Sequence, residues 1–381
     1  PEYLDLREDD HKQEKVNALS VELSNHTFDL ENGPLFKAQL VHVEENTYAL
    51  LFALHHIISD GWTMDVLFKD LTALYEGFLT QDRNVLAPLA IQYKDYAAWE
   101  HRQLQGELLQ GHRDYWLAQF AGELPVLELR TDFPRPPVIT NNAGTVNFLI
   151  DEVLRNKLVD LSHQQHVTLV MTLMTAFNTL LFRYSNQYDL IIGTPFGGRI
   201  RTELENQVGI FLNLLALRTQ FSEQETFISL LKKTQKTVLG AFEHQVYPFD
   251  RIVKDLELRR HPGRSPLFDV MFSWQNTTEE SFYPSEEDFL QQDPDTITED
   301  SKYDLTFIFS DFQKGVFTSI KYNSDLFTKE TIDGFKKRFL KIIESSVANP
   351  EIALVEIDLG QVKEQPKKRE SFIKQNFNTK F

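Results

Sequence analysis

Apolar positions follow two different periods in the first third of the chain. Two mostly apolar stretches flank the polar turn Glu44–Asn46 and predict a pair of strands. From Thr63 the apolar residues recur every three or four positions as far as Phe78, which is the pattern of an amphipathic helix. The elements predicted here are strands at 35–43 and 47–56 and helices at 63–78 and 89–120, the last one broken near Gly106 or Gly111.

The two periods alternate again in the second half. The elements predicted there are strands at 145–150, 189–193, 267–275, 303–311 and 316–323 and helices at 152–165, 168–184, 227–244 and 329–347. Between the halves, prolines at 134, 136 and 137 oppose a helix. We therefore predict two α/β lobes, 1–125 and 143–360, joined by a proline-rich connection at 126–142 and followed by a polar linker at 361–381. A long surface loop inside one domain is the alternative to this boundary.

Composition narrows the classes of function. The chain has 381 residues and a net charge of −17, and we find no basic patch, so we expect no nucleic-acid partner. It has no cysteine, which excludes disulfides, Cys-ligated zinc, iron–sulfur clusters and a Cys nucleophile, and fits a cytoplasmic protein. The longest apolar run, 48–54, is far shorter than the roughly 20 residues that span a bilayer, so we expect no membrane partner. The opening Pro1–Tyr3 lacks an initiator Met and a leader, which indicates an internal piece of a longer chain.

The sharpest chemical feature is the segment Leu54–Trp62, where a strand gives way to a turn and a helix. Strand alternation would place Leu54 and His56 on one face and His55 on the other. Adjacent histidines on opposite faces cannot ligate one metal, so we predict no metal site. A catalytic histidine and a pair of hydrogen-bonded structural histidines are both consistent with the residues.

Asp60 has two interpretations as well. An Asp-Gly pair before a helix is typical of an N-cap or a turn. It could also hold the turn rigid by pairing with Arg199, which ends a glycine-rich turn in the other half. That turn lacks the spacing of a phosphate loop, and the chain lacks the nucleophile elbow of hydrolases.

Several ordered motifs resemble the condensation domains of nonribosomal peptide synthetases, which belong to the chloramphenicol-acetyltransferase-like acyltransferases. His55–Gly61 matches the H-H-x-x-x-D-G signature of that family. The other matches, in the family's order, are Tyr93–Trp99, Gly193–Arg199, Val208–Arg218, His244–Asp250 and Arg264–Phe268. The family's opening S-x-A-Q-x-R and R-H-E-x-L-R-T elements do not occur, so we expect the first lobe to be incomplete.

The resemblance implies a fold and an activity. The fold would be two acetyltransferase-like lobes in a V shape, with the active site in a tunnel between them. The activity would be amide formation between an upstream acyl or peptidyl thioester and the amine of a downstream aminoacyl thioester. Both substrates would ride on the 4'-phosphopantetheine of donor and acceptor peptidyl carrier proteins, with an adenylation domain as neighbour. No metal, redox cofactor or other bound cofactor of the domain itself is implied.

The resemblance also implies residue roles. His56 would either take the amine proton or orient the amine by a hydrogen bond, with orientation favoured, while His55 and Asp60 would be architectural. Gly61 would allow close substrate approach, and its backbone N–H would contact the developing oxyanion. Arg199 would give structural support. Three further residues are candidates to line the tunnel, namely Trp62, Asn213 and Trp274.

A purely structural role is the alternative for two of the candidate tunnel residues. A hydrogen-bonded structural amide is the alternative for Asn213, and core packing is the alternative for Trp274. The aromatics of 93–99 are expected to pack between helices. At the level of function, the alternatives are a stand-alone acyltransferase that uses coenzyme A, a non-catalytic docking module and an epimerisation domain. Gly61–Trp62 after the aspartate disfavours the last of these.

Overall fold

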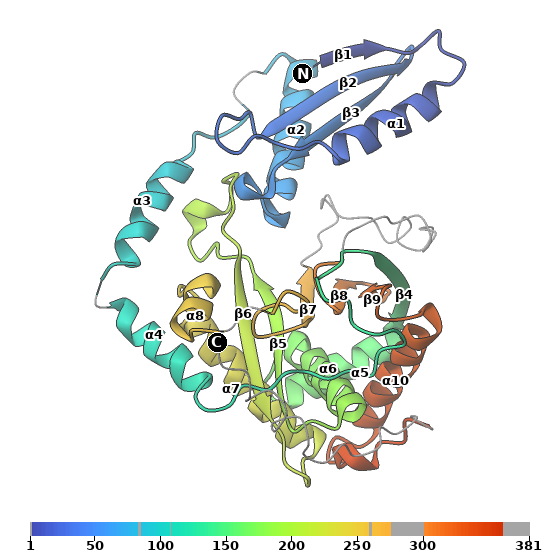
Figure 1. Ribbon diagram of the computed structural model, residues 1–381. Coiled ribbons are helices and arrows are strands. Elements are labelled where there is room, and N and C mark those ends of the chain that lie inside the picture. Colours follow the sequence, from blue (N-terminus) through green and yellow to red (C-terminus); the bar gives the residue numbers. More distant parts are fainter. Residues whose placement is uncertain (1, 83–84, 107, 259–260, 276–300, 361–381) are drawn as a thin grey trace, which may run out of the picture. The chain divides into compact units, whose positions relative to one another are not determined.

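Figure 1 shows the fold as a computed structural model, which describes residues 2–82, 85–106, 108–258, 261–275 and 301–360. Contacts within the chain divide it into two units. Unit 1 contains residues 2–103 and 197–212, and unit 2 contains the remaining described residues. The predicted lobe boundaries at 125, 142 and 360 stay predictions, as do the V shape and the tunnel. The predicted linker at 361–381 lies outside the described residues.

A three-stranded sheet forms the centre of unit 1. Its strands are β1 (Glu2–Asp5), β2 (Phe36–Glu44) and β3 (Thr47–Leu54), in the order β1-β2-β3, with α1 (Lys12–Ser24) packed on β2 and β3. β2 and β3 pair antiparallel, which confirms the predicted hairpin, and β1 pairs parallel to β2. β1 and α1 were not predicted, because residues 1–34 are mostly polar and show no clear apolar period.

The helix that follows the hairpin is confirmed as α2 (Gly61–Thr80). Its apolar stripe, however, stays accessible. The large exposed residues of the stripe are Phe68, Leu71, Leu74, Tyr75 and Phe78, with between 36% and 70% of their surface exposed. An amphipathic pattern predicts a helix and one apolar face, but it does not supply the element that covers that face.

Unit 1 also contains a helix and a returning loop from far along the chain. The helix is α3 (Tyr93–Gln103), and the loop is Gly197–Leu212, which we call the strap. The strap includes the short 3-10 turn Thr202–Leu204. Tyr96 and Phe211 are buried together with Leu204 in a small apolar cluster that joins α3 to the strap. The aromatics of 93–99 therefore do pack, but against the strap rather than between two helices.

Unit 2 is built on a mixed six-stranded sheet in the order β4-β9-β8-β7-β5-β6. The strands are β4 (Ala143–Asp151), β5 (Asp189–Phe196), β6 (Asn213–Gln220), β7 (Val270–Gln275), β8 (Leu305–Phe312) and β9 (Gly315–Asn323). The helices are α4 (Leu108–Gln119), α5 (Glu152–Gln164), α6 (Leu169–Ser185), α7 (Phe227–Glu243), α8 (Phe249–Asp255) and α10 (Lys329–Ala348), with a 3-10 turn at Leu354–Glu356. The break between α3 and α4 falls at the predicted Gly106, and 126–142 contains no helix or strand.

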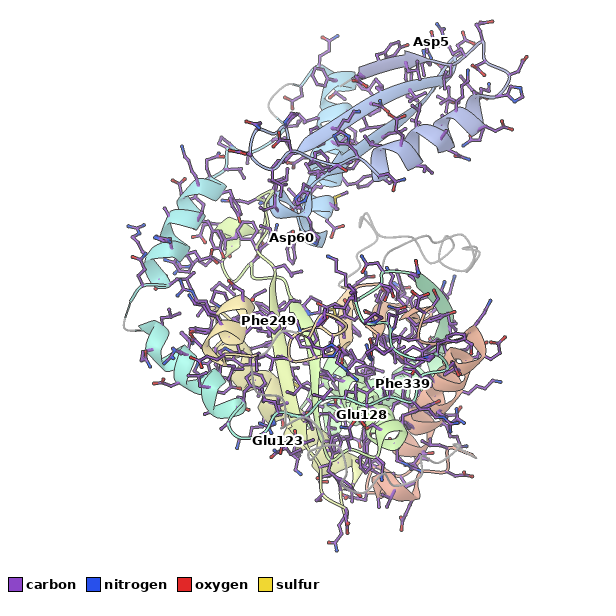
Figure 2. The ribbon with its side chains drawn as sticks, in the orientation of Figure 1. Asp5, Asp60, Glu123, Glu128, Phe249 and Phe339 are labelled. Atoms are coloured by element: carbon purple, nitrogen blue, oxygen red, sulfur yellow. The ribbon has the colours of Figure 1, made fainter. Side chains whose placement is uncertain are left out.

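Phenylalanine dominates the core of unit 2. α6 is buried along almost its whole length and contacts α5, α7, α10 and β7. Phe177 of α6 lies 4.8 Å from Phe307 between ring centroids, and Phe307 lies 5.4 Å from Phe339 of α10, which is labelled in Figure 2. Such aromatic pairs contribute about 0.5–1.5 kcal/mol each beyond the area they bury. Most helices and strands of this unit were predicted, whereas β6 and α8 were not.

The described helices include none that alone is long and apolar enough to cross a membrane. A bent pair, α5 with α6, passes that test by length and composition. α6 is the core helix of unit 2, and core helices pass the same test.

Candidate active site

The turn between β3 and α2 carries both adjacent histidines. β3 ends at Leu54, His55 is still extended, and His56 begins a 3-10 turn that runs to Ile58. The prediction that His56 shares a strand face with Leu54 is therefore wrong, because strand alternation stops one residue earlier. A turn of this kind, rather than the pleat of a strand, sets the direction of the His56 side chain.

His56 is held by one short hydrogen bond within the turn. Its Nδ1 lies 2.6 Å from the carbonyl oxygen of Ser59. A carbonyl oxygen only accepts, so Nδ1 carries the proton and donates. In the neutral ring Nε2 then has the free lone pair, and His56 is exposed. The ring is thus an accessible acceptor of known tautomer. Ser59 was not predicted, because it acts through its backbone.

His55 has the opposite protonation pattern. Its Nδ1 accepts a hydrogen bond from the backbone N–H of Ile57 at 3.1 Å and so caps the 3-10 turn. Its backbone N–H donates to the carbonyl of Leu35, and its ring meets Phe28 edge-on at 6.0 Å. His55 therefore orders the turn. Among the described residues, no group of three or more His, Asp or Glu side chains is arranged to hold a metal ion.

Asp60 is the N-cap of α2 and is labelled in Figure 2. One carboxylate oxygen accepts the backbone N–H of Thr63 at 2.9 Å. The other accepts Arg199 Nη1 at 2.6 Å and the backbone N–H of Phe211 at 3.0 Å. The Asp60 and Arg199 side chains are only 3% and 1% exposed, so this is a buried ion pair with several supporting hydrogen bonds. The predicted pairing is present.

The strap closes around this ion pair. Arg199 Nη2 donates to the carbonyl of Gln207 at 3.1 Å, and its guanidinium lies 4.3 Å from the centroid of the Phe211 ring. Gly198 has a φ of +67°, and a Cβ there would lie 1.9 Å from the carbonyl oxygen of Phe211. Glycine at 198 is therefore required by both backbone conformation and space.

Two more predicted residues sit in the first turn of α2. Trp62 donates from Nε1 to the carbonyl of Glu205 in the strap at 2.8 Å and remains 41% exposed. Gly61 is the first residue of the helix. Backbone N–H groups in the first turn of a helix point outward without intrahelical partners. The contributions of Trp62 to a tunnel and of Gly61 to an oxyanion contact stay predictions.

Asn213 and Trp274 belong to unit 2, whereas the turn between β3 and α2 belongs to unit 1. The Asn213 amide donates to the carbonyls of Gln245 and Tyr247 at 2.7 and 3.0 Å. Its oxygen accepts the backbone N–H groups of Leu214 and Phe249. This matches the structural alternative for Asn213. Trp274 is partly buried and packs against the main core. The tunnel-lining roles of Asn213 and Trp274 stay predictions.

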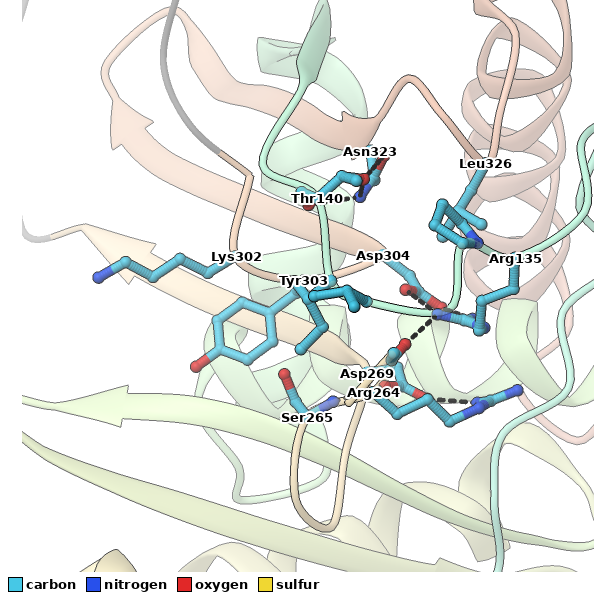
Figure 3. A pocket seen from close by; sticks show the side chains of 14 residues that line it. Arg135, Thr140, Arg264, Ser265, Asp269, Lys302, Tyr303, Asp304, Asn323 and Leu326 are labelled. Carbon is cyan, nitrogen blue, oxygen red and sulfur yellow. Dashed lines mark hydrogen bonds and ion pairs between the residues drawn. The ribbon is translucent and has the colours of Figure 1, made fainter. Parts of the chain in front are cut away.

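Figure 3 shows a second charged site, at the start of β7 and β8. Arg135 pairs with Asp304, and Arg264 pairs with Asp269. Burial, together with the neighbouring Asp304, raises the pKa of Asp269. The cavity among these residues is about 10 Å³, which holds one water at most. The cluster therefore ties the proline-rich connection to the sheet and offers no space for a substrate.

The chain matches the family model of the condensation domain over residues 2–367. It is 39% identical over 333 residues to surfactin synthase subunit 1 of Bacillus subtilis strain 168, covering 87% of this chain and 9% of that protein. It is also 37% identical over 342 residues to gramicidin S synthase 2 of Aneurinibacillus migulanus, covering 90% and 8%. The chain therefore spans less than a tenth of the length of these curated relatives.

A solved structure supports the fold. In the complex of the X-domain and OxyB from teicoplanin biosynthesis, one chain superposes with a TM-score of 0.81 at 26% identity. The match covers 94% of this chain and 79% of the other. Nearly the whole of the present chain therefore has the same architecture as that solved structure.

Proposed function

This chain belongs to the condensation-domain family, and we propose that it forms an amide bond between two carrier-bound thioesters. The donor would be an acyl or peptidyl thioester, and the acceptor would be the free amine of an aminoacyl thioester. Both would be held on the 4'-phosphopantetheine arms of carrier proteins, with an adenylation domain next to the chain. The match to segments of large peptide synthases supports these partners.

The observation that carries this proposal is the fixed tautomer of His56. Because Nδ1 donates to Ser59, Nε2 can accept a hydrogen bond from the incoming amine. This bond directs the lone pair of the amine nitrogen at the thioester carbon. A free α-amine has a pKa of about 8, so a sizeable fraction is already neutral near pH 7. Orientation is then the larger contribution of His56, and proton acceptance the smaller one.

The reaction balances without any further group. The amine nitrogen attacks the carbonyl carbon, a C–N bond forms, and the carbonyl oxygen becomes an oxyanion. The C–S bond then breaks, and the amine proton passes through Nε2 of His56 to the departing thiolate. The backbone N–H of Gly61, in the first turn of α2, is the group we assign to the oxyanion. His55, Asp60 and Arg199 keep the turn in place.

The test is reconstitution with a donor carrier protein bearing an acyl group and an acceptor carrier protein bearing an amino acid. Intact-protein mass spectrometry should show the acyl mass leaving the donor and appearing on the acceptor. His56→Ala should lower the single-turnover rate by about 10²–10⁴-fold. His163→Ala is the matched control, because His163 is exposed on α5 of unit 2. A wild-type rate in His56→Ala would refute the role of His56, and a wild-type protein that moves no acyl mass to the acceptor would refute the proposed reaction.

The same assay separates the alternatives. A stand-alone acyltransferase would use an acyl-coenzyme A donor as readily as the loaded carrier. A docking module would bind loaded carriers and yield no amide product. We favour the condensation reaction over both, because the curated relatives are peptide synthases and His56 is accessible.

A further inference from the structure

Thr63 lies at the centre of the contacts between α2 and the strap. It is the third residue of the helix and is completely buried. Its hydroxyl oxygen lies 2.9 Å from Asp60 Oδ1 and 2.9 Å from the carbonyl oxygen of Gly209. The backbone N–H of Gly209 and Nη2 of Arg199 approach it at 3.2 and 3.3 Å.

A hydroxyl has one proton to donate and two lone pairs to accept with. The N–H of Gly209 and the guanidinium of Arg199 are donors and occupy both lone pairs. The single proton is then shared between two equidistant acceptors, Asp60 and the Gly209 carbonyl. The hydrogen-bonding capacity of the Thr63 hydroxyl is therefore fully used by Asp60, Arg199 and Gly209.

The position of His56 depends on this junction through one peptide. Asp60 directly follows Ser59, whose carbonyl oxygen receives the Nδ1 proton of His56. A displaced Asp60 turns the Ser59–Asp60 peptide and removes the acceptor that selects the tautomer of His56. In the other tautomer Nε2 carries the proton and cannot accept from an amine.

We propose that Thr63 is a positioning residue, which holds the Ser59–Asp60 peptide so that His56 keeps a proton on Nδ1 and a free lone pair on Nε2. The expected effect of Thr63 on the reaction rate rests on the proposed function. The expected effect of Thr63 on the tautomer of His56 does not depend on any reaction. Thr63 does not contact the substrate in this mechanism.

Two substitutions at Thr63 and one control separate the role of the hydroxyl from that of the methyl group. Thr63→Val keeps the shape and removes the hydroxyl, and Thr63→Ser keeps the hydroxyl and removes the methyl. Thr72→Val is the matched control, because Thr72 lies on the exposed face of the same helix and donates only to the carbonyl of Phe68. Thr63→Ala replaces Thr63→Val should the latter fail to fold.

The first readout is proton–nitrogen NMR on protein labelled in its 11 histidines. The His56 signals are assigned by their loss in His56→Gln. Measured at about pH 8.5, where an ordinary imidazole is neutral, the wild type and the Thr63→Ser and Thr72→Val variants should show the Nδ1–H tautomer. Thr63→Val should show a mixture of both tautomers. A wild type with its proton on Nε2, or a Thr63→Val variant with an unchanged tautomer, overturns the inference.

The second readout is the single-turnover rate with both loaded carriers. Thr63→Val should lose about 10- to 100-fold, and Thr63→Ser should recover to within about threefold of the wild type. If Thr63→Val reacts at the wild-type rate while His56→Ala is inactive, the positioning role is wrong and the proposed function stands. If the wild type itself forms no amide from the two loaded carriers, the proposed function fails, and the tautomer result still decides the role of Thr63.

Discussion

Arg199 reaches Asp60 across 139 positions of sequence, and its Nη1 lies 2.6 Å from Oδ2 with both side chains almost inaccessible. This pair attaches the strap to the first turn of α2, and with it the turn that carries both histidines. Removing one partner of a buried pair leaves the other as an uncompensated charge, which costs more than the pair itself contributes.

Asp60→Asn should therefore be strongly destabilising although asparagine is a good N-cap. We expect the free energy of unfolding of unit 1 to fall by about 3–5 kcal/mol in urea titration, because Arg199 loses its counter-charge. Asp5→Asn is the control, since Asp5 pairs with Arg7 on the surface and is 40% exposed; it should leave the urea midpoint almost unchanged, because exposed ion pairs contribute little. Equal small losses in both variants would contradict the role of the buried pair.

Alanine substitutions at two adjacent glycines of the strap should differ in their effect on stability. Gly198→Ala forces alanine to φ +67° and directs its Cβ at the carbonyl oxygen of Phe211. We expect a loss of more than about 1–2 kcal/mol, the cost of the left-handed conformation alone. A methyl group added at Gly197 would meet no heavy atom within 4 Å, so Gly197→Ala should change stability by less than about 0.5 kcal/mol. Thermal unfolding of the two variants side by side decides this.

Asp255 of α8 should contribute to stability only above acid pH. The Tyr247 hydroxyl donates to this carboxyl and lowers its pKa below the ordinary 3.8, burial opposes that shift, and Arg113 of α4 lowers the pKa further. Burial and the same hydrogen bond raise the pKa of Tyr247 to about 12, so the hydroxyl stays a donor at neutral pH.

The sign follows from linkage. A pKa that is lower in the folded state stabilises the protein above the unfolded value of 3.8, and this contribution is lost as the pH falls through the folded pKa. Asp255→Asn should thus be less stable than the wild type near neutral pH and converge with it in acid. Urea midpoints measured from about pH 7 down to about pH 3 test this. Asp114→Asn, at an exposed position of α4, is the control, and parallel curves for wild type and Asp255→Asn would refute the prediction.

Asn213→Ala tests the structural interpretation of that amide. It leaves the carbonyls of Gln245 and Tyr247 without their donor, so we expect a loss of about 1–3 kcal/mol in unfolding free energy. The single-turnover rate of the folded fraction should stay near that of the wild type. Asn17→Ala, on the exposed face of α1, should be neutral or slightly stabilising. A normal stability with a large rate loss would instead favour a role for Asn213 beside the substrate.

The sequence by itself determined the secondary structure wherever an apolar period was clear, and it determined the family. The hairpin, α2, α6, α7 and α10 all follow from residues within a few positions of one another, because periodicity is a local property. The ordered motifs led to the condensation-domain family, and the family model confirms that membership. β1 and α1 were not predicted, because residues 1–34 are mostly polar and their few apolar residues follow no clear period.

Apart from the Asp60–Arg199 pair, which the sequence already suggested, only the tertiary structure decided which partner each polar group of the site has. Three features of the site depend on backbone groups, which every residue type except proline carries alike. They are the end of β3 at Leu54, the proton on Nδ1 of His56 and the four bonds of the Asn213 amide. The junction at Thr63 joins groups up to 146 positions apart. Hydrogen bonding between distant segments leaves no periodic trace in a sequence, so the contacts that Trp62 and Thr63 make with the strap could not be predicted from it.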